Sequence, residues 1–163
     1  MTIKSTLLAL ALLAVASLAP VSVTSAADSP DPAIGSWTLN LQKSKLDPSL
    51  PAVKSAMRTY SASPGGLTVS QQTVDASGAT RESGAAFTYD GQKHPVKGVT
   101  DYDTISVKRV GTNESKSEMF RDGKLIGHLT RVVSKDGKTL TVTSDLTSAK
   151  GAKIHDVAVY DRQ

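Results

Sequence analysis

The stretch Gly35-Ser36-Trp37-Thr38-Leu39-Asn40-Leu41 alternates apolar and polar side chains, which is typical of a β-strand with one buried face. The stretches that follow it are also rich in β-forming residues and are separated by turn signals. The strongest of these signals are Asp-Gly pairs at residues 90–91, 122–123 and 136–137, because Asp-Gly between apolar stretches favours a tight hairpin turn. Tight turns make consecutive strands antiparallel neighbours. The sequence therefore predicts an all-β, up-and-down antiparallel chain.

Eight to ten strands are expected over residues 35–163, with no substantial helix after the N-terminal segment. A twisted sheet of so many strands usually closes, because closure removes its exposed edges. Residues 35–163 are therefore predicted to form one β-barrel domain, with an interior that is either filled by side chains or has room for one small ligand. The interval 42–54 contains Pro48 and Pro51 and is expected to be a crossing loop.

Residues 1–27 have the organisation of a secretory signal peptide. Lys4 precedes an apolar run over residues 7–19, and small residues at 25–27 suit cleavage after Ala27. The apolar run is too short to span a bilayer comfortably. The chain contains no cysteine, which excludes disulfides and a cysteine-linked lipid anchor and favours a bacterial periplasm or exterior. We therefore expect an exported protein whose residues 28–34 form a flexible leader and whose mature chain does not span a membrane.

Composition and spacing argue against several classes of function. The net charge is only +4, the basic residues are scattered among acidic ones, and seven aromatic residues offer little for base stacking, so no nucleic-acid partner is expected. His94, His128 and His155 are too far apart in sequence to indicate a metal site. No Gly-x-Ser-x-Gly elbow is present. The sequence thus predicts no catalytic residues, no metal and no cofactor.

Gly35-Ser36-Trp37 at the head of an antiparallel meander resembles the lipocalin and fatty-acid-binding-protein (calycin) superfamily, whose members begin with a Gly-x-Trp strand. The resemblance implies a small, exported, bacterial lipocalin-like barrel. In the fatty-acid-binding branch, an Arg-x-Tyr pair on the last strand and an arginine on an earlier strand grip a ligand carboxylate. This chain resembles that pattern at Tyr160 and Arg131, but Ala158 replaces the arginine of the pair, and the 42–54 loop replaces the helical lid.

Four side chains are candidates for ligand contact, namely Tyr89, Lys108, Arg131 and Tyr160. The strands that carry Arg131 and Tyr160 are apolar on both faces, so alternation does not decide which face looks inward. In lipocalins a basic residue packs across the first-strand tryptophan. The resemblance therefore implies that Trp37 plugs one end of the barrel under Arg162, in a cation–π contact.

The leading interpretation is a non-enzymatic barrel that binds a small, partly apolar or amphipathic ligand in its interior, with one or two polar groups that orient it. The alternative is a filled barrel that docks a protein partner, as an inhibitor does, through the 28–34 leader and the 42–54 loop. An internal void of roughly several hundred Å³ would favour the first interpretation, and a packed core would favour the second.

Overall fold

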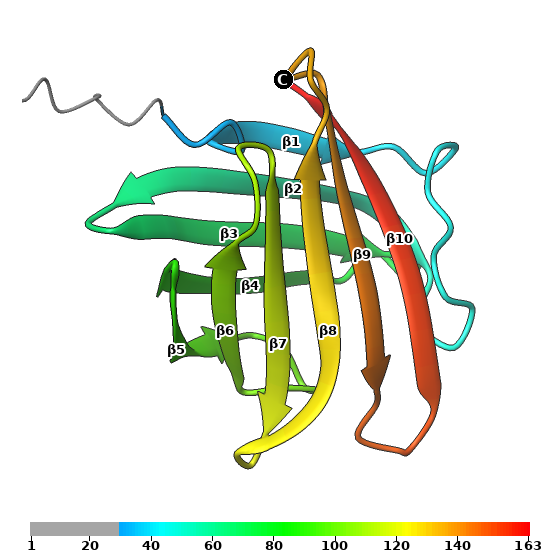
Figure 1. Cartoon of the computed structure of the whole chain (residues 1–163). Helices are drawn as coiled ribbons and strands as arrows, with labels where there is room; N and C mark the ends of the chain where they lie inside the picture. The colour runs from blue at the N-terminus through cyan, green and yellow to red at the C-terminus, as the bar shows by residue number, and fades with distance from the viewer. Residues whose placement is uncertain (1–29) are drawn as a thin grey trace, which may run out of the picture.

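The computed structural model describes residues 30–163 and shows a closed, all-antiparallel β-barrel in which each strand pairs with its neighbours in sequence and β1 closes the ring against β10 (Figure 1). The predicted signal peptide and the first two leader residues lie outside the described residues. No helix occurs within residues 30–163, so none there could cross a membrane. The ten strands are β1 (Gly35–Leu39), β2 (Val53–Ser63), β3 (Gly66–Asp75), β4 (Thr80–Thr88), β5 (Asp90–Lys97), β6 (Thr104–Arg109), β7 (Glu114–Arg121), β8 (Lys124–Val133), β9 (Thr139–Thr147) and β10 (Lys153–Arg162). The predicted barrel is confirmed, at the upper end of the expected number of strands.

The hairpins form where the sequence places residues that tolerate a positive φ. Asp122 and Gly123 have φ values of 50° and 75°, which suits the two-residue turn between β7 and β8. The junction at Asp90-Gly91 is looser than the predicted hairpin. β4 and β5 do not pair next to this junction; they pair only farther along, at Gly84 with Lys97 and at Ala85 with Val96, which is the shortest ladder among the described strands.

The first strand is too short to close the barrel along its whole height. β1 pairs with β10 from Trp37 to Leu39 and with β2 from Gly35 to Thr38. Residues 40–52 cross from β1 to β2 beside β10, as the cyan loop in Figure 1 shows, and Lys45 of this loop pairs with Val157 of β10. This loop is the crossing segment expected at 42–54, except that its last two residues belong to β2.

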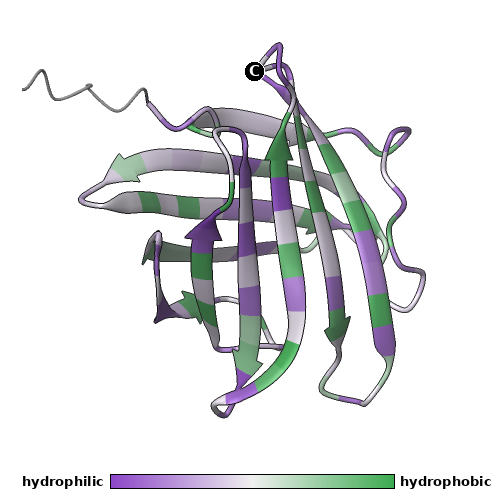
Figure 2. Ribbon diagram, viewed as in Figure 1, coloured by the Kyte–Doolittle hydropathy of each residue, from purple (hydrophilic) through white to green (hydrophobic). Residues whose placement is uncertain are grey.

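The core occupies the barrel interior and follows the alternation of the strands (Figure 2). The inward faces that the sequence left open are settled by the register. On β10 the buried side chains are Ile154, Ala158 and Tyr160, and on β8 Arg131 and Val133 are buried, whereas Leu125 and Val132 on β8 are exposed. The largest fully buried side chains are Trp37, Leu67, Val107, Met119, Val133 and Leu140.

Candidate functional site

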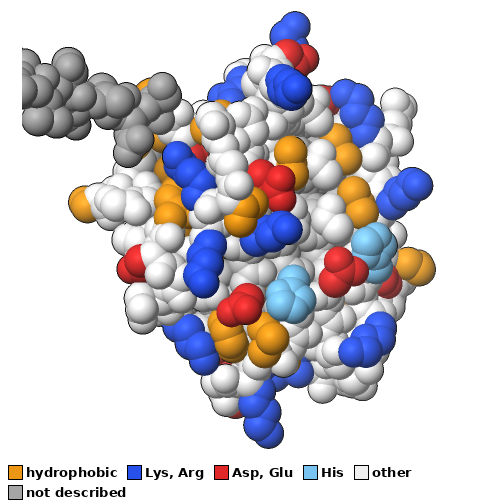
Figure 3. All heavy atoms as spheres, viewed as in Figure 1, with side chains coloured by type: hydrophobic (Ala, Val, Ile, Leu, Met, Phe, Trp, Pro, Cys, Tyr) orange, Lys and Arg blue, Asp and Glu red, His pale blue; other side chains and the backbone are white. Residues whose placement is uncertain are grey.

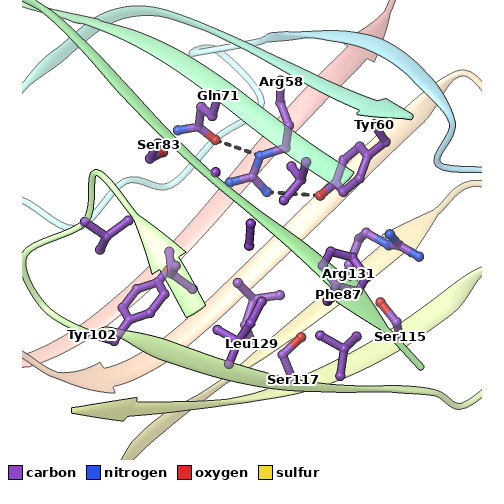
Figure 4. A pocket seen from close by; sticks show the side chains of 17 residues that line it. Arg58, Tyr60, Gln71, Ser83, Phe87, Tyr102, Ser115, Ser117, Leu129 and Arg131 are labelled. Carbon is purple, nitrogen blue, oxygen red and sulfur yellow. Dashed lines mark hydrogen bonds between the residues drawn. The ribbon is translucent and has the colours of Figure 1, made fainter. Parts of the chain in front are cut away.

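A small cavity of about 80 Å³ lies inside the barrel (Figure 4). Strands from β2 to β8 supply its walls. Its apolar part includes Val69, Phe87, Val96, Ile105, Val107 and Leu129, and its polar part includes Arg58, Tyr60, Gln71, Tyr102, Ser115, Ser117 and Arg131. Two guanidinium groups therefore border a cavity whose other walls are mostly uncharged.

Arg131 lies on the inner face of β8 and is only 5% exposed. Its Nη2 donates to Tyr89 Oη at 2.8 Å and to the two Asp31 carboxylate oxygens at 3.3 and 3.4 Å. Its Nε and Nη1 are buried and have no hydrogen-bond partner among residues 30–163. Burial alone would lower the pKa of Arg131, but Tyr60, Tyr89 and Asp31 outweigh it, so the pKa is raised and the group stays charged.

Asp31 brings a carboxylate into the same end of the barrel from the segment before β1. Its side chain is 5% exposed and accepts hydrogen bonds from Arg109 Nη2 at 2.6 Å, from the hydroxyl of Tyr89 and from the backbone N–H of Ala33 at 2.9 Å. Burial alone would raise the pKa of Asp31, but the Tyr89 hydrogen bond and the arginine charges lower it overall. Asp31 therefore compensates part of the charge of Arg131.

Residues 31–34 of the expected flexible leader are packed against the barrel, which the sequence did not suggest. Ala33 is fully buried and Asp31 is 8% exposed as a residue. The physical reason is that the buried guanidinium of Arg131 needs a counter-charge, and Asp31 supplies it across 100 residues of sequence.

Arg58 is the second guanidinium at the cavity. It projects from β2, where its Nε donates to Gln71 Oε1 at 2.7 Å and its Nη1 to Tyr60 Oη at 3.4 Å, as the dashed lines in Figure 4 show. Its guanidinium also lies 5.2 Å from the ring centre of Tyr160. Burial would lower the pKa of Arg58, but Tyr160, Tyr60 and Tyr102 raise it. No carboxylate of the described residues forms a salt bridge with Arg58.

The four predicted ligand-contact residues lie at different places relative to the cavity. Arg131 lines the cavity, and Tyr89 holds Arg131 from beside it. Tyr160 is buried but lines a neighbouring pocket, from which its hydroxyl donates to Gln71. Lys108 is exposed on the outer face of β6 because its neighbour Val107 points inward, so Lys108 does not line the cavity as the sequence prediction would require.

Sequence reasoning missed Arg58, Tyr60, Gln71, Tyr102, Asp31 and Arg109. One signal was present for the first two. Arg58-Thr59-Tyr60 has the same Arg-x-Tyr spacing that the resemblance placed on the last strand, and this spacing puts both side chains on one face. Asp31 and Gln71 carry no comparable signal.

Trp37 and Arg162 close the barrel near the leader. The Trp37 side chain is fully buried, its Nε1 donates to the carbonyl of Ala33 at 2.8 Å, and Arg162 Cζ lies 4.1 Å from its ring centre. Arg162 also donates to the carbonyls of Pro32, Ile34 and Gly137. These bonds fix the segment before β1 over the tryptophan.

The histidines do not gather around a common centre. His155 Nδ1 lies 2.6 Å from Asp145 Oδ1 in an exposed contact, and His94 contacts Thr88 beside the β4–β5 junction. On the face that Figure 3 shows, histidine side chains lie beside acidic ones at separate places. Within residues 30–163, no group of three or more His, Asp or Glu side chains is arranged to hold a metal ion.

Comparisons with known proteins place the fold but assign no ligand. No family model and no curated protein matches the chain. Among solved structures, the chain is similar to Rv2717c from M. tuberculosis, with a TM-score of 0.50 and 17% identity over 81% of this chain and 93% of that one. It is also similar to the siderocalin Ex-FABP, described as functioning through dual ligand specificities, with a TM-score of 0.40 and 13% identity over 81% of this chain and 74% of that one.

The first likeness concerns the fold alone, and the second is too distant to support an argument. What the comparison supports is the fold that the structure shows, a closed antiparallel barrel of ten strands within residues 30–163.

Proposed function

We propose that this protein is a non-enzymatic binding protein that holds a small amphipathic anion in the barrel, with the anionic group between Arg131 and Arg58. The observation that carries the proposal is Arg131, which is 5% exposed and leaves two nitrogens without a partner among the described residues. An unsatisfied buried donor costs roughly 1–3 kcal/mol, and more when it is charged. A carboxylate or a similar anion beside the guanidinium would give at least one of these nitrogens an acceptor.

The charges around the cavity also favour an anionic ligand. Arg58 and Arg131 both border it, whereas Asp31 is already bound by Arg109, Tyr89 and Arg131. Guanidinium groups bind planar anions through two parallel hydrogen bonds, which fixes orientation as well as charge. A volume of about 80 Å³ has room for about two or three water molecules, and hence for the anionic group of a ligand.

A binding role is proposed in preference to catalysis because of what borders the cavity. Its polar walls are guanidinium, phenol, amide and hydroxyl groups, and no histidine or carboxylate of residues 30–163 lines it. We also propose that the protein is exported to a periplasm or the cell exterior. That part of the proposal rests on the sequence of residues 1–27.

The test is a titration of the ¹⁵N-labelled protein with sodium acetate, read on the arginine Nε–H resonances. We expect the Arg131 and Arg58 signals to shift with acetate, and Arg131→Gln to weaken binding by about tenfold or more. Arg131→Lys keeps the charge but loses the planar guanidinium, so its affinity for acetate is expected to lie between that of the wild type and that of Arg131→Gln. Lys108→Gln, which removes an exposed cation, is the matched control. Equal affinity in wild type and in a folded Arg131→Gln variant would contradict the proposal.

The docking module remains the second candidate, because an 80 Å³ cavity is smaller than the roughly 300–1,000 Å³ typical of small-molecule sites. Its two proposed docking segments are, however, packed against the barrel itself, the leader through Asp31 and the loop through a bridge from Lys45 to Val157. Native mass spectrometry of protein purified without delipidation separates the two functions. A co-purifying small molecule supports the binding protein, and a stoichiometric protein partner supports the docking module.

A further inference from the structure

A second and larger pocket lies at the side of the barrel, beneath the 40–52 loop. It forms where β1 ends and leaves the gap between β10 and β2 to the loop. Its volume is about 570 Å³, within the range of small-molecule sites. Leu46 and Leu50 cover it from the loop, and Leu39, Val53, Ala56 and Ala158 supply apolar walls from the barrel. We call it the loop pocket.

Gln71 separates the loop pocket from the inner cavity, because its side chain lines both. Its Oε1 accepts hydrogen bonds from Arg58 Nε at 2.7 Å and from Tyr160 Oη at 3.3 Å. Arg58 belongs to the inner cavity and Tyr160 to the loop pocket. The partition between the two spaces is therefore a hydrogen-bonded group of three polar side chains centred on one neutral amide.

We propose that the loop pocket and the inner cavity form one extended site, in which Gln71 determines the length of ligand that is accepted. The anionic group binds at Arg58 and Arg131, and the apolar chain of the ligand lies beneath Leu46 and Leu50. The inference rests on the proposed function, and it adds where the apolar part of the ligand goes and which residue controls access to that space.

The hydrogen bonds of the partition allow a ligand carboxylate to replace Gln71 as the acceptor for Arg58. Arg58 Nε donates to the neutral amide oxygen of Gln71. A carboxylate oxygen is a stronger acceptor for a guanidinium than a neutral amide. A ligand that crosses from one pocket to the other therefore replaces the bond that Gln71 loses. The rotated Gln71 side chain still has Thr73 Oγ1, now 3.0 Å from its Nε2, as a neighbour on β3.

Volume gives the second argument. The inner cavity holds little more than the anionic group itself, whereas the loop pocket is about seven times larger by the two volumes, 570 and 80 Å³. Each methylene moved from water into an apolar pocket strengthens binding by about fourfold. Affinity is therefore expected to rise with chain length until the loop pocket is full.

The experiment is a set of calorimetric and NMR titrations with acetate, butanoate and octanoate. In the wild type we expect octanoate to bind at least about a hundredfold more tightly than acetate. Two variants fill the loop pocket from opposite sides, Ala158→Leu from β10 and Leu50→Trp from the loop. Each is expected to weaken octanoate binding by about tenfold while acetate binding is unchanged. Ala62→Leu, at an exposed position of β2, is the matched control.

Gln71→Ala opens the partition and is expected to raise the ratio of octanoate to acetate affinity. Equal affinity for the three acids, or an octanoate affinity that neither filling variant changes, would overturn the extended site and leave the proposed function standing. An unchanged ratio in Gln71→Ala would overturn the role of Gln71. Failure of acetate to bind the wild type at all would instead overturn the proposed function.

Discussion

The two segments that flank β1 do opposite things at the barrel wall. The segment before it, residues 31–34, seals one end through a buried carboxylate, a fully buried Ala33 and the Trp37–Arg162 stack. The segment after it, residues 40–52, covers a pocket of about 570 Å³ instead of filling it. One short strand thus separates a sealed end from a hollow side, and under the proposed function the hollow side is where a ligand would enter.

The contacts that hold the two segments differ in kind. Asp31 is bound by two guanidinium groups and a phenol, and its own side chain is buried. The loop is held by a backbone bridge from Lys45 to Val157 and by Asp47, whose carboxylate accepts from the backbone N–H of His155 at 2.9 Å. Exposed contacts of this kind contribute little to stability and open locally. The sealed end is therefore expected to open only when the whole barrel unfolds. The loop is expected to open locally at a lower free energy.

The largest expected effect is at the sealed end. Trp37→Ala removes the largest fully buried side chain and is expected to lower the free energy of unfolding by about 3–5 kcal/mol. Leu50→Ala, the corresponding truncation in the loop, removes a side chain that borders an open pocket and is expected to cost less than about 1.5 kcal/mol. Urea unfolding followed by circular dichroism measures both. Equal losses would mean that the loop is as much a part of the core as the sealed end.

The next largest effect concerns the buried carboxylate. Asp31→Asn keeps the shape but leaves Arg131 without its counter-charge, and about 2–3 kcal/mol of stability is expected to be lost at pH 7. Folding lowers the pKa of Asp31. The charged carboxylate therefore stabilises the fold above the unfolded-state value near 3.9, and this contribution is lost as pH falls through the folded-state pKa.

The measurement is the difference in unfolding free energy between wild type and Asp31→Asn across acidic pH. That difference should shrink as pH falls below about 4. Asp122→Asn is the control, because asparagine also tolerates the left-handed turn conformation at this position and no buried ion pair is lost. A pH-independent difference for Asp31→Asn would show that its charge is not what seals the barrel.

The sequence was sufficient for the architecture because architecture depends on local signals. Alternation in residues 35–41 and the Asp-Gly turns indicate strands and hairpins, and closure follows from the need to cover the edges. Inward faces depend instead on register across neighbouring strands. Arg131 and Tyr160 lie on strands with apolar residues on both faces, so only pairing with β7, β9 and β1 decides that both point inward.

The candidate site was harder to predict because its members meet only after closure. Asp31 stands among prolines in a segment that looks flexible, and its partner Arg131 lies 100 residues away. Arg58 breaks the apolar alternation of β2, and a half-buried arginine on its inner face is plausible only once Gln71 and Tyr60 are known to surround it. The sequence did not show that Lys108 faces outward, whereas the adjacent Val107 faces the interior.

The smallest expected effect is at the anchor of the loop. Asp47→Ala removes the bonds to Ser49 and to the backbone of His155 and is expected to lower global stability by only about 0.5–1 kcal/mol. The same change should free the loop locally, so trypsin is expected to cleave after Lys43 or Lys45 faster than in the wild type. Asp75→Ala is the matched control, because Asp75 accepts the same kind of bonds from Ser77 in another exposed turn. If both variants leave cleavage at the loop unchanged, Asp47 does not hold it, and the hollow side of the barrel is as firmly closed as the sealed end.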